Sequence, residues 1–247
     1  MTKTRCDLEM KEFMSQALNA TESWLKAMNS RQNIVAAETC HHFIEQYKSD
    51  FRSRNFNITE SDYNTMLVVL IFMRGIFDCT RLSLIVDSNT DWDKDNKTLE
   101  FVWITLCDAW ERLAFSYSFC QGRAIDMALL SLNRLERYYL QRFGSGSYVS
   151  PGIESDGCLC SICLQDIRAC SHVPGKLYNG TFCSMQPINP SPAHVALVDS
   201  PADRRCRIWP WNIEDPQDGE VKISMMVMCS FSLDCFLFED VDESQIQ

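Results

Sequence analysis

Cysteine and histidine side chains are concentrated in one short stretch of the chain, from Cys158 to Cys183. These 26 residues hold five of the thirteen cysteines and one of the four histidines. Thiolates and imidazoles are the ligands that Zn²⁺ prefers in proteins, and a pair spaced like Cys160 and Cys163 is typical of a knuckle that binds one tetrahedral ion. The stretch therefore predicts a zinc site.

The predicted zinc site has more candidate ligands than the four that a structural ion takes. We predict the set Cys160, Cys163, His172 and Cys183, with Cys170 and Cys158 as alternates. One residue separates Cys170 from His172, so we expect only one of them to face inward, and either could complete the site. Gly175 and the turn Asn179-Gly180 would return the chain to Cys183. Four protein ligands leave no open position, which predicts a structural ion.

The spacing C-x2-C-x6-C-x-H-x10-C resembles the small zinc knuckles of zinc ribbons and treble-clef modules. The resemblance covers about 26 residues of the chain. Modules of this kind serve protein binding, nucleic-acid binding and stability alike, so the resemblance implies a metal and leaves the function open.

Residue patterns that could support catalysis are weaker signals in this sequence than the cysteine cluster. The sequence has no GxSxG, Walker A or GxGxxG pattern, and no HExxH accompanies the cysteines. His41 and His42, with Glu38 and Glu45, have the spacing of half a two-metal helical site, but the second half is missing. We therefore predict solvated histidines, no catalytic residue, and a protein that is not an enzyme.

One cationic and aromatic segment offers an alternative function. It consists of Arg204, Arg205, Arg207, Trp209 and Trp211, called here the Arg–Trp patch. Such a patch could stack on single-stranded bases, which would suit an accessory protein that binds or processes nucleic acid. Acidic residues surround it, so we favour a packed strand with cation–π contacts.

The placement of proline and glycine predicts the fold class. No proline precedes Pro151, and only two of nine glycines precede Gly144. Both residues disfavour helix interiors, so residues 1–143 are predicted to form an all-α bundle. The expected helices are Asp7–Met28, Asn33–Arg52, Glu60–Val86, Thr98–Phe119 and Arg123–Phe143. The third is apolar on most faces and should be central, with Thr59 as N-cap and Asp62 as its capping-box partner.

The second half of the chain is predicted to be a small zinc-binding α+β domain. Residues 144–157 are rich in glycine and serine, which predicts a flexible linker before a domain at 158–238. Short antiparallel strands are expected at Ala193–Val198 and Cys206–Trp209, and period-2 alternation predicts more strand at Val221–Phe238. Residues 239–247 form an acidic tail that we expect to be disordered.

Charge and composition restrict the partners and the cellular compartment that we expect for the protein. The formal charge is −10, with about −2 in residues 1–150 and about −8 in residues 151–247, which disfavours nucleic acid as a general partner. The longest apolar run, Met66–Met73, is too short to span a bilayer, and scattered cysteines suit a reducing cytosol. We expect a cytoplasmic interaction subunit of a multiprotein assembly, with a protein partner or homo-oligomer and no membrane.

Overall fold

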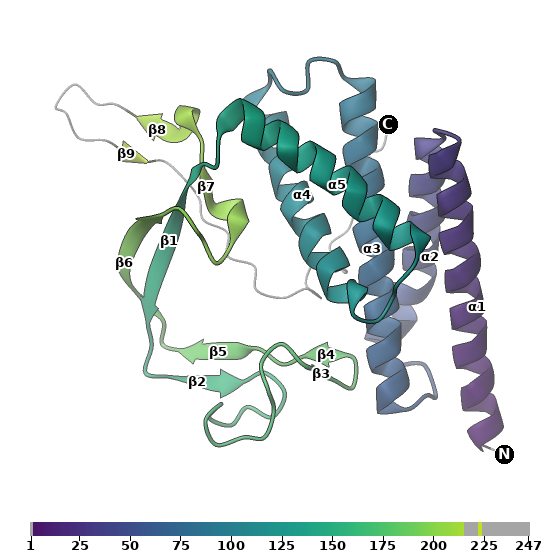
Figure 1. The fold of residues 1–247 in the computed structure, drawn as a ribbon. Coiled ribbons are helices and arrows are strands. Elements are labelled where there is room, and N and C mark those ends of the chain that lie inside the picture. Colours follow the sequence, from purple (N-terminus) through teal and green to yellow (C-terminus); the bar gives the residue numbers. More distant parts are fainter. Residues whose placement is uncertain (1, 215–221, 224–247) are drawn as a thin grey trace.

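Five helices form a bundle that precedes a region of small antiparallel sheets in the computed structural model, which describes residues 2–214 and 222–223 and the side chains of residues 8–211 (Figure 1). This confirms the α+β fold class. The helices are α1 (Thr2–Asn29), α2 (Asn33–Arg52), α3 (Glu60–Ser88), α4 (Asn96–Tyr117) and α5 (Arg123–Phe143).

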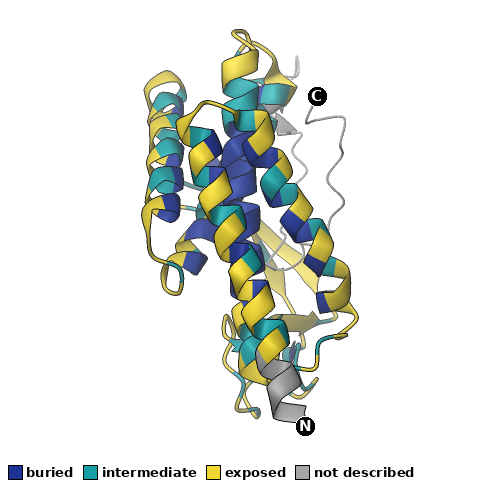
Figure 2. Ribbon diagram, turned by 90° about the vertical axis from the view of Figure 1, so that its right-hand side faces the viewer, coloured by how far each residue is buried: buried dark blue, intermediate teal, exposed yellow. Residues whose placement is uncertain are grey.

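Helix α3 is the centre of the bundle, as its apolar sequence predicts. Residues Met66–Phe77 are all buried, and the other helices surround this stretch (Figure 2). The helix begins with the predicted capping box, in which the Thr59 side chain accepts from the Asp62 N–H and the Asp62 carboxylate accepts from the Thr59 N–H. This reciprocal cap satisfies backbone donors that the first turn of a helix otherwise leaves unpaired.

In the described part of the chain, nine short strands follow the bundle. They are β1 (Ser147–Glu154), β2 (Gly157–Cys160), β3 (Leu177–Tyr178), β4 (Thr181–Phe182), β5 (Met185–Ile188), β6 (Ser191–Val198), β7 (Arg207–Ile208), β8 (Ile213–Glu214) and β9 (Lys222–Ile223), with short 3₁₀ helices η1 (Arg204–Cys206) and η2 (Pro210–Asn212). The pairing is antiparallel throughout, in the order β6-β1-β7 and in the pairs β2-β5, β3-β4 and β8-β9.

Two segments of the second half differ from the expected secondary structure. The glycine- and serine-rich residues 144–157 contain strand β1, because β6 supplies hydrogen-bond partners that are distant in sequence. The expected strand Cys206–Trp209 is the end of η1 followed by the shorter β7. Within Val221–Phe238 only β9 is described, and residues 239–247 lie outside the described part. The division into domains at 144–157 stays a prediction.

The hairpin of β3 and β4 packs against the bundle (Figure 1). The Gly180 N–H donates to Asn64 Oδ1 at 2.6 Å, and the Asn179 N–H donates to Glu60 Oε1 at 3.1 Å. Phe182 is buried against the bundle core. The segment that carries the cysteines is therefore held directly on the first turns of α3.

A second contact joins the chain after β6 to helices α4 and α5. Trp209 is buried, with its ring centroid 6.1 Å from that of Trp103 and 5.5 Å from that of Phe143. The Arg207 guanidinium lies over both tryptophan rings, 4.9 Å from the Trp103 centroid and 4.7 Å from that of Trp209. The cation–π contacts expected for the Arg–Trp patch are thus made inside the protein.

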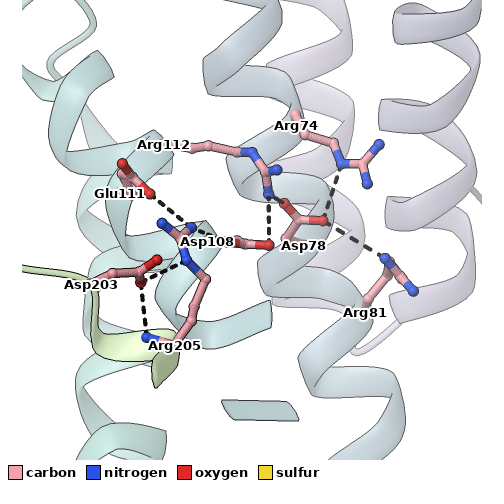
Figure 3. A network of polar contacts seen from close by, with 8 residues as sticks. All are labelled: Arg74, Asp78, Arg81, Asp108, Glu111, Arg112, Asp203 and Arg205. Atoms are coloured by element: carbon pink, nitrogen blue, oxygen red, sulfur yellow. Dashed lines mark hydrogen bonds and ion pairs between the residues drawn. The ribbon is translucent and has the colours of Figure 1, made fainter. Parts of the chain in front are cut away.

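Eight charged residues form a network across α3, α4 and η1 (Figure 3). They are Arg74, Asp78, Arg81, Asp108, Glu111, Arg112, Asp203 and Arg205. Asp78 is almost completely buried and pairs with three arginines, two of them on its own helix. Arg74, Asp78 and Arg81 therefore form a stripe along α3 that is buried in the fold.

None of the described helices is both long and apolar enough to cross a membrane.

Candidate metal centre

The Cys160-x2-Cys163 pair forms a tight turn at the end of β2. The Leu164 N–H donates to the Cys160 carbonyl at 2.8 Å, and the Ile162 N–H points at the Cys160 sulfur from 3.4 Å. Leu164 has a φ of 58°, a left-handed conformation that is uncommon for a residue other than glycine. The turn directs both sulfurs to one side, as a zinc knuckle requires.

Cys170 and His172 approach the knuckle from the loop that follows it. Asp166 organises this loop, because its carboxylate accepts from the Arg168 N–H at 2.9 Å and from the Arg168 guanidinium. One ligand atom from each of Cys160, Cys163, Cys170 and His172 lies within 4.8 Å of all the others. Within the described residues this is the one such group of cysteine, histidine and carboxylate side chains.

Cys183 reaches the same place from the other side. The Asn179-Gly180 turn has φ values of 47° and 67° and reverses the chain between β3 and β4, as the sequence predicts. The Cys183 sulfur then lies 3.7 Å from that of Cys160. Two thiolates about 2.3 Å from one tetrahedral zinc ion are separated by about 3.8 Å, so Cys183 also has the spacing of a ligand.

The structure thus brings five of the six candidate ligands together. Cys158 lies on β2 outside the four-residue group, and its sulfur is 4.0 Å from Ser155 Oγ. Cys170 and His172 both belong to the group, although we expected only one to face inward. Side chains two residues apart share a face wherever the backbone is extended, so such a spacing does not by itself separate them.

Burial and hydrogen bonding set the protonation of the thiols. Burial raises the pKa of Cys160, but the N–H groups of Cys163 and Ile162 and the Cys183 thiol outweigh it and lower this pKa to about 6. Burial, together with the neighbouring Cys160, raises the pKa of Cys183 to about 11. Burial also raises the pKa of Cys170. The Cys160 thiol is therefore deprotonated more readily than those of Cys170 and Cys183.

The His172 ring is held in place but lacks a partner for one nitrogen. Its edge meets the Tyr178 ring at a centroid distance of 4.6 Å, and Nδ1 is buried with no hydrogen-bond partner. A buried ring nitrogen without a partner is costly, and a metal ion would remove that cost. This observation is independent of the spacing of the cysteines.

The remaining sequence candidates lie elsewhere. His41 and His42 are on α2, where His41 lies near the Phe77 ring, and they belong to no metal-binding group of the described residues.

The Arg–Trp patch is engaged internally. Arg205 pairs with Asp108, Glu111 and Asp203, and Arg204 pairs with Glu136. Trp211 is stacked on Trp209. The sequence did not reveal these partners, because most of them are contributed by α4 and α5, distant in the chain.

No known protein family, curated protein or solved structure matches this chain.

Proposed function

We propose that this chain is a non-enzymatic interaction subunit stabilised by one structural Zn²⁺ ion. The observation that carries the proposal is the convergence of Cys160, Cys163, Cys170 and His172. Sulfur and nitrogen donors in this number suit tetrahedral zinc, and a site closed by four side chains leaves no position for a substrate.

The place of the site in the fold supports a structural role. Its residues lie on short strands and turns with little core of their own, and a metal ion commonly stabilises such segments. The hairpin between His172 and Cys183 is also the part that contacts α3. An ion bound here would fix the second half of the chain to the bundle.

Metal analysis of purified protein tests the ion. We expect about one zinc per chain, lost on Cys160→Ser and retained on Cys158→Ser, the matched control outside the group. Protein purified without chelator that contains no zinc, or equal loss in both variants, would contradict the proposal.

Cobalt substitution tests the ligand set. Thiolate-to-cobalt absorption weakens with each thiolate removed, so Cys170→Ser should weaken it and Cys183→Ser should leave it unchanged. If Cys183→Ser weakens the absorption and Cys170→Ser does not, Cys183 takes the place of Cys170 as a ligand. If His172→Ala still binds the metal, Cys183 takes the place of His172.

The interaction role is tested by capture from native lysate with and without nuclease, together with a salt-dependent binding assay on short single-stranded DNA and RNA. We expect a protein partner that withstands nuclease, and no steeply salt-dependent nucleic-acid binding. Nucleic-acid binding abolished by Arg205→Ala and Arg207→Ala in folded protein would overturn the interaction role in favour of the nucleic-acid alternative.

A further inference from the structure

A cleft of about 540 Å³ lies between α3 and α5 and is bounded at one end by the loop that joins α3 to α4 (Figure 1). Sites for small molecules in proteins commonly have volumes of about 300–1,000 Å³, so the cleft has the size of a ligand site. It lies at the last turns of α3, whereas the cysteine segment is held on the first turns of that helix. The two sites are therefore at opposite ends of α3.

The floor of the cleft is apolar. Leu82, Trp92 and Leu132 are buried there, and Val86 and Leu135 are half-buried beside them. Such a floor can cover the apolar part of a ligand, while polar groups at the rim fix its orientation.

Three charged residues line the cleft, and one of them is already neutralised by the protein. The Asp93 carboxylate accepts a hydrogen bond from the Tyr138 hydroxyl and lies 3.0 Å from Arg142 Nη1. Asp93 therefore needs no charge from a ligand.

The other two, Asp87 on α3 and Arg134 on α5, provide one open charge of each sign. Both residues are exposed, and the Asp87 carboxylate accepts a hydrogen bond from Asn33 Nδ2 at 3.0 Å. Among the described residues, neither Asp87 nor Arg134 forms an ion pair, with each other or with a third residue. The rim of the cleft thus offers an anion and a cation that are both available to a ligand.

The position of Asp87 is unfavourable for α3 itself. Asp87 lies in the last turn of the helix, where the helix dipole repels an anion and attracts a cation, and no basic residue lies in that turn. A hydrated surface charge would be better placed almost anywhere else on the helix. A bound ammonium group would match both the Asp87 carboxylate and the carbonyl end of α3.

We propose that this cleft binds a free α-amino acid with a large apolar side chain. The ammonium group pairs with Asp87, and the carboxylate pairs with the Arg134 guanidinium, which can bind it through two parallel hydrogen bonds. The apolar side chain covers the floor around Val86 and Leu135. An apolar acid or an apolar amine would leave one of the two open charges unmatched, whereas an amino acid matches both.

The amino-acid site goes beyond the proposed function and does not depend on it. Neither the zinc ion nor a protein partner contributes to the cleft. A chain that binds the amino acid but contains no zinc would refute the structural-zinc proposal alone.

Isothermal titration calorimetry on the full chain tests the ligand class. The probes are L-phenylalanine and L-leucine, compared with 3-phenylpropionate, 2-phenylethylamine and L-serine, which lack the ammonium group, the carboxylate and the apolar side chain respectively. We expect saturable binding of one L-phenylalanine or L-leucine per chain, with a dissociation constant at least about 10-fold lower than for each analogue, because each analogue loses one matched group.

Substitutions at the rim test the assignment of the two charges. Asp87→Asn and Arg134→Gln should each weaken L-phenylalanine binding by at least about 10-fold. Asp126→Asn and Arg137→Gln, at exposed residues of α5 outside the cleft, are the matched controls and should bind normally. Arg134→Gln should leave the affinity for 2-phenylethylamine unchanged, because that probe has no carboxylate.

The Asp87 variant also separates loss of binding from loss of folding. Asp87→Asn removes an anion from the C-terminal turn of a helix, so its melting temperature should be equal to that of the parent chain or higher. The absence of saturable binding by either amino acid, or equal affinity for the three analogues, overturns the inference. Weakening in only one of the two rim variants also overturns it, because the ligand would then need only one charge.

Discussion

Replacing Asp78 by asparagine keeps the shape of the side chain and removes a charge from the centre of the buried network. The Asp78 side chain is 2% exposed; Oδ1 lies 3.2 Å from Arg74 Nε and 3.9 Å from Arg81, and Oδ2 pairs with Arg112. The intact network contains four arginines and four carboxylates (Figure 3), so the variant leaves one buried cation without compensation.

The expected cost follows from that imbalance. Breaking a buried ion pair by removing one partner costs about 3–5 kcal/mol, against about 5–15 kcal/mol for the whole free energy of unfolding. With a urea m value of about 3 kcal/mol/M, the unfolding midpoint should fall by about 1–2 M. Tryptophan fluorescence follows the transition, because Trp103 and Trp209 report on the junction of α4 with the second half.

The matched control is Asp91→Asn, which breaks an ion pair with Lys94 in which both side chains are more than half exposed. Exposed pairs contribute less than about 1 kcal/mol. A double-mutant cycle with Arg112→Met should give a coupling of at least about 1 kcal/mol, since removing both charges relieves part of the cost. Equal losses in Asp78→Asn and Asp91→Asn would refute the view that the network is shielded from water.

Two further predictions concern the metal loop and its contact with the bundle. Gly180→Ala should lower the free energy of unfolding by about 1–3 kcal/mol more than Gly144→Ala, because both glycines have φ near 68° but a Cβ at Gly180 would lie 2.9 Å from Phe51 and 3.2 Å from Tyr63. Equal melting temperatures would contradict this packing. For Asp166, hydrogen bonds from Arg168 lower the carboxyl pKa from its ordinary value of 3.8 to about 2. Its stabilising contribution is therefore present above pH 3.8 and lost as the pH falls to about 2; NMR titration should show the pKa rising in Arg168→Ala, and an unchanged value would disprove the assignment.

The helices were predictable because their signals are local. The bounds of α2 and α5 agree with those expected from apolar spacing, and the capping box at Thr59 marks the start of α3. Helix α4 begins two residues earlier than expected, since Asp95 is the N-cap and accepts from the Thr98 N–H. The preceding loop contains several residues that can cap a helix, so composition alone did not select among them.

The sheets and the details of the site were harder to predict from the sequence, because they depend on contacts between residues that are distant in the chain. Strand β1 lies in a segment whose glycines and serines predict flexibility, and only its pairing with β6 makes it a strand. The cysteine spacing identified the metal loop correctly as a cluster. It did not show that Cys170 and His172 both face the group, or that Asn64 and Glu60 hold the adjoining hairpin.

The docking of the hairpin on α3 also has a consequence for biosynthesis. Asn64 and Gly180, which form one of its hydrogen bonds, are 116 residues apart in the chain. At about 5–20 residues per second, a ribosome needs about 6–23 s to make the intervening segment. Throughout that interval the helices can assemble while the face around Phe51 and Tyr63 is uncovered. Chaperone binding or premature association should therefore concentrate on nascent chains that contain Tyr63 but do not yet contain Gly180.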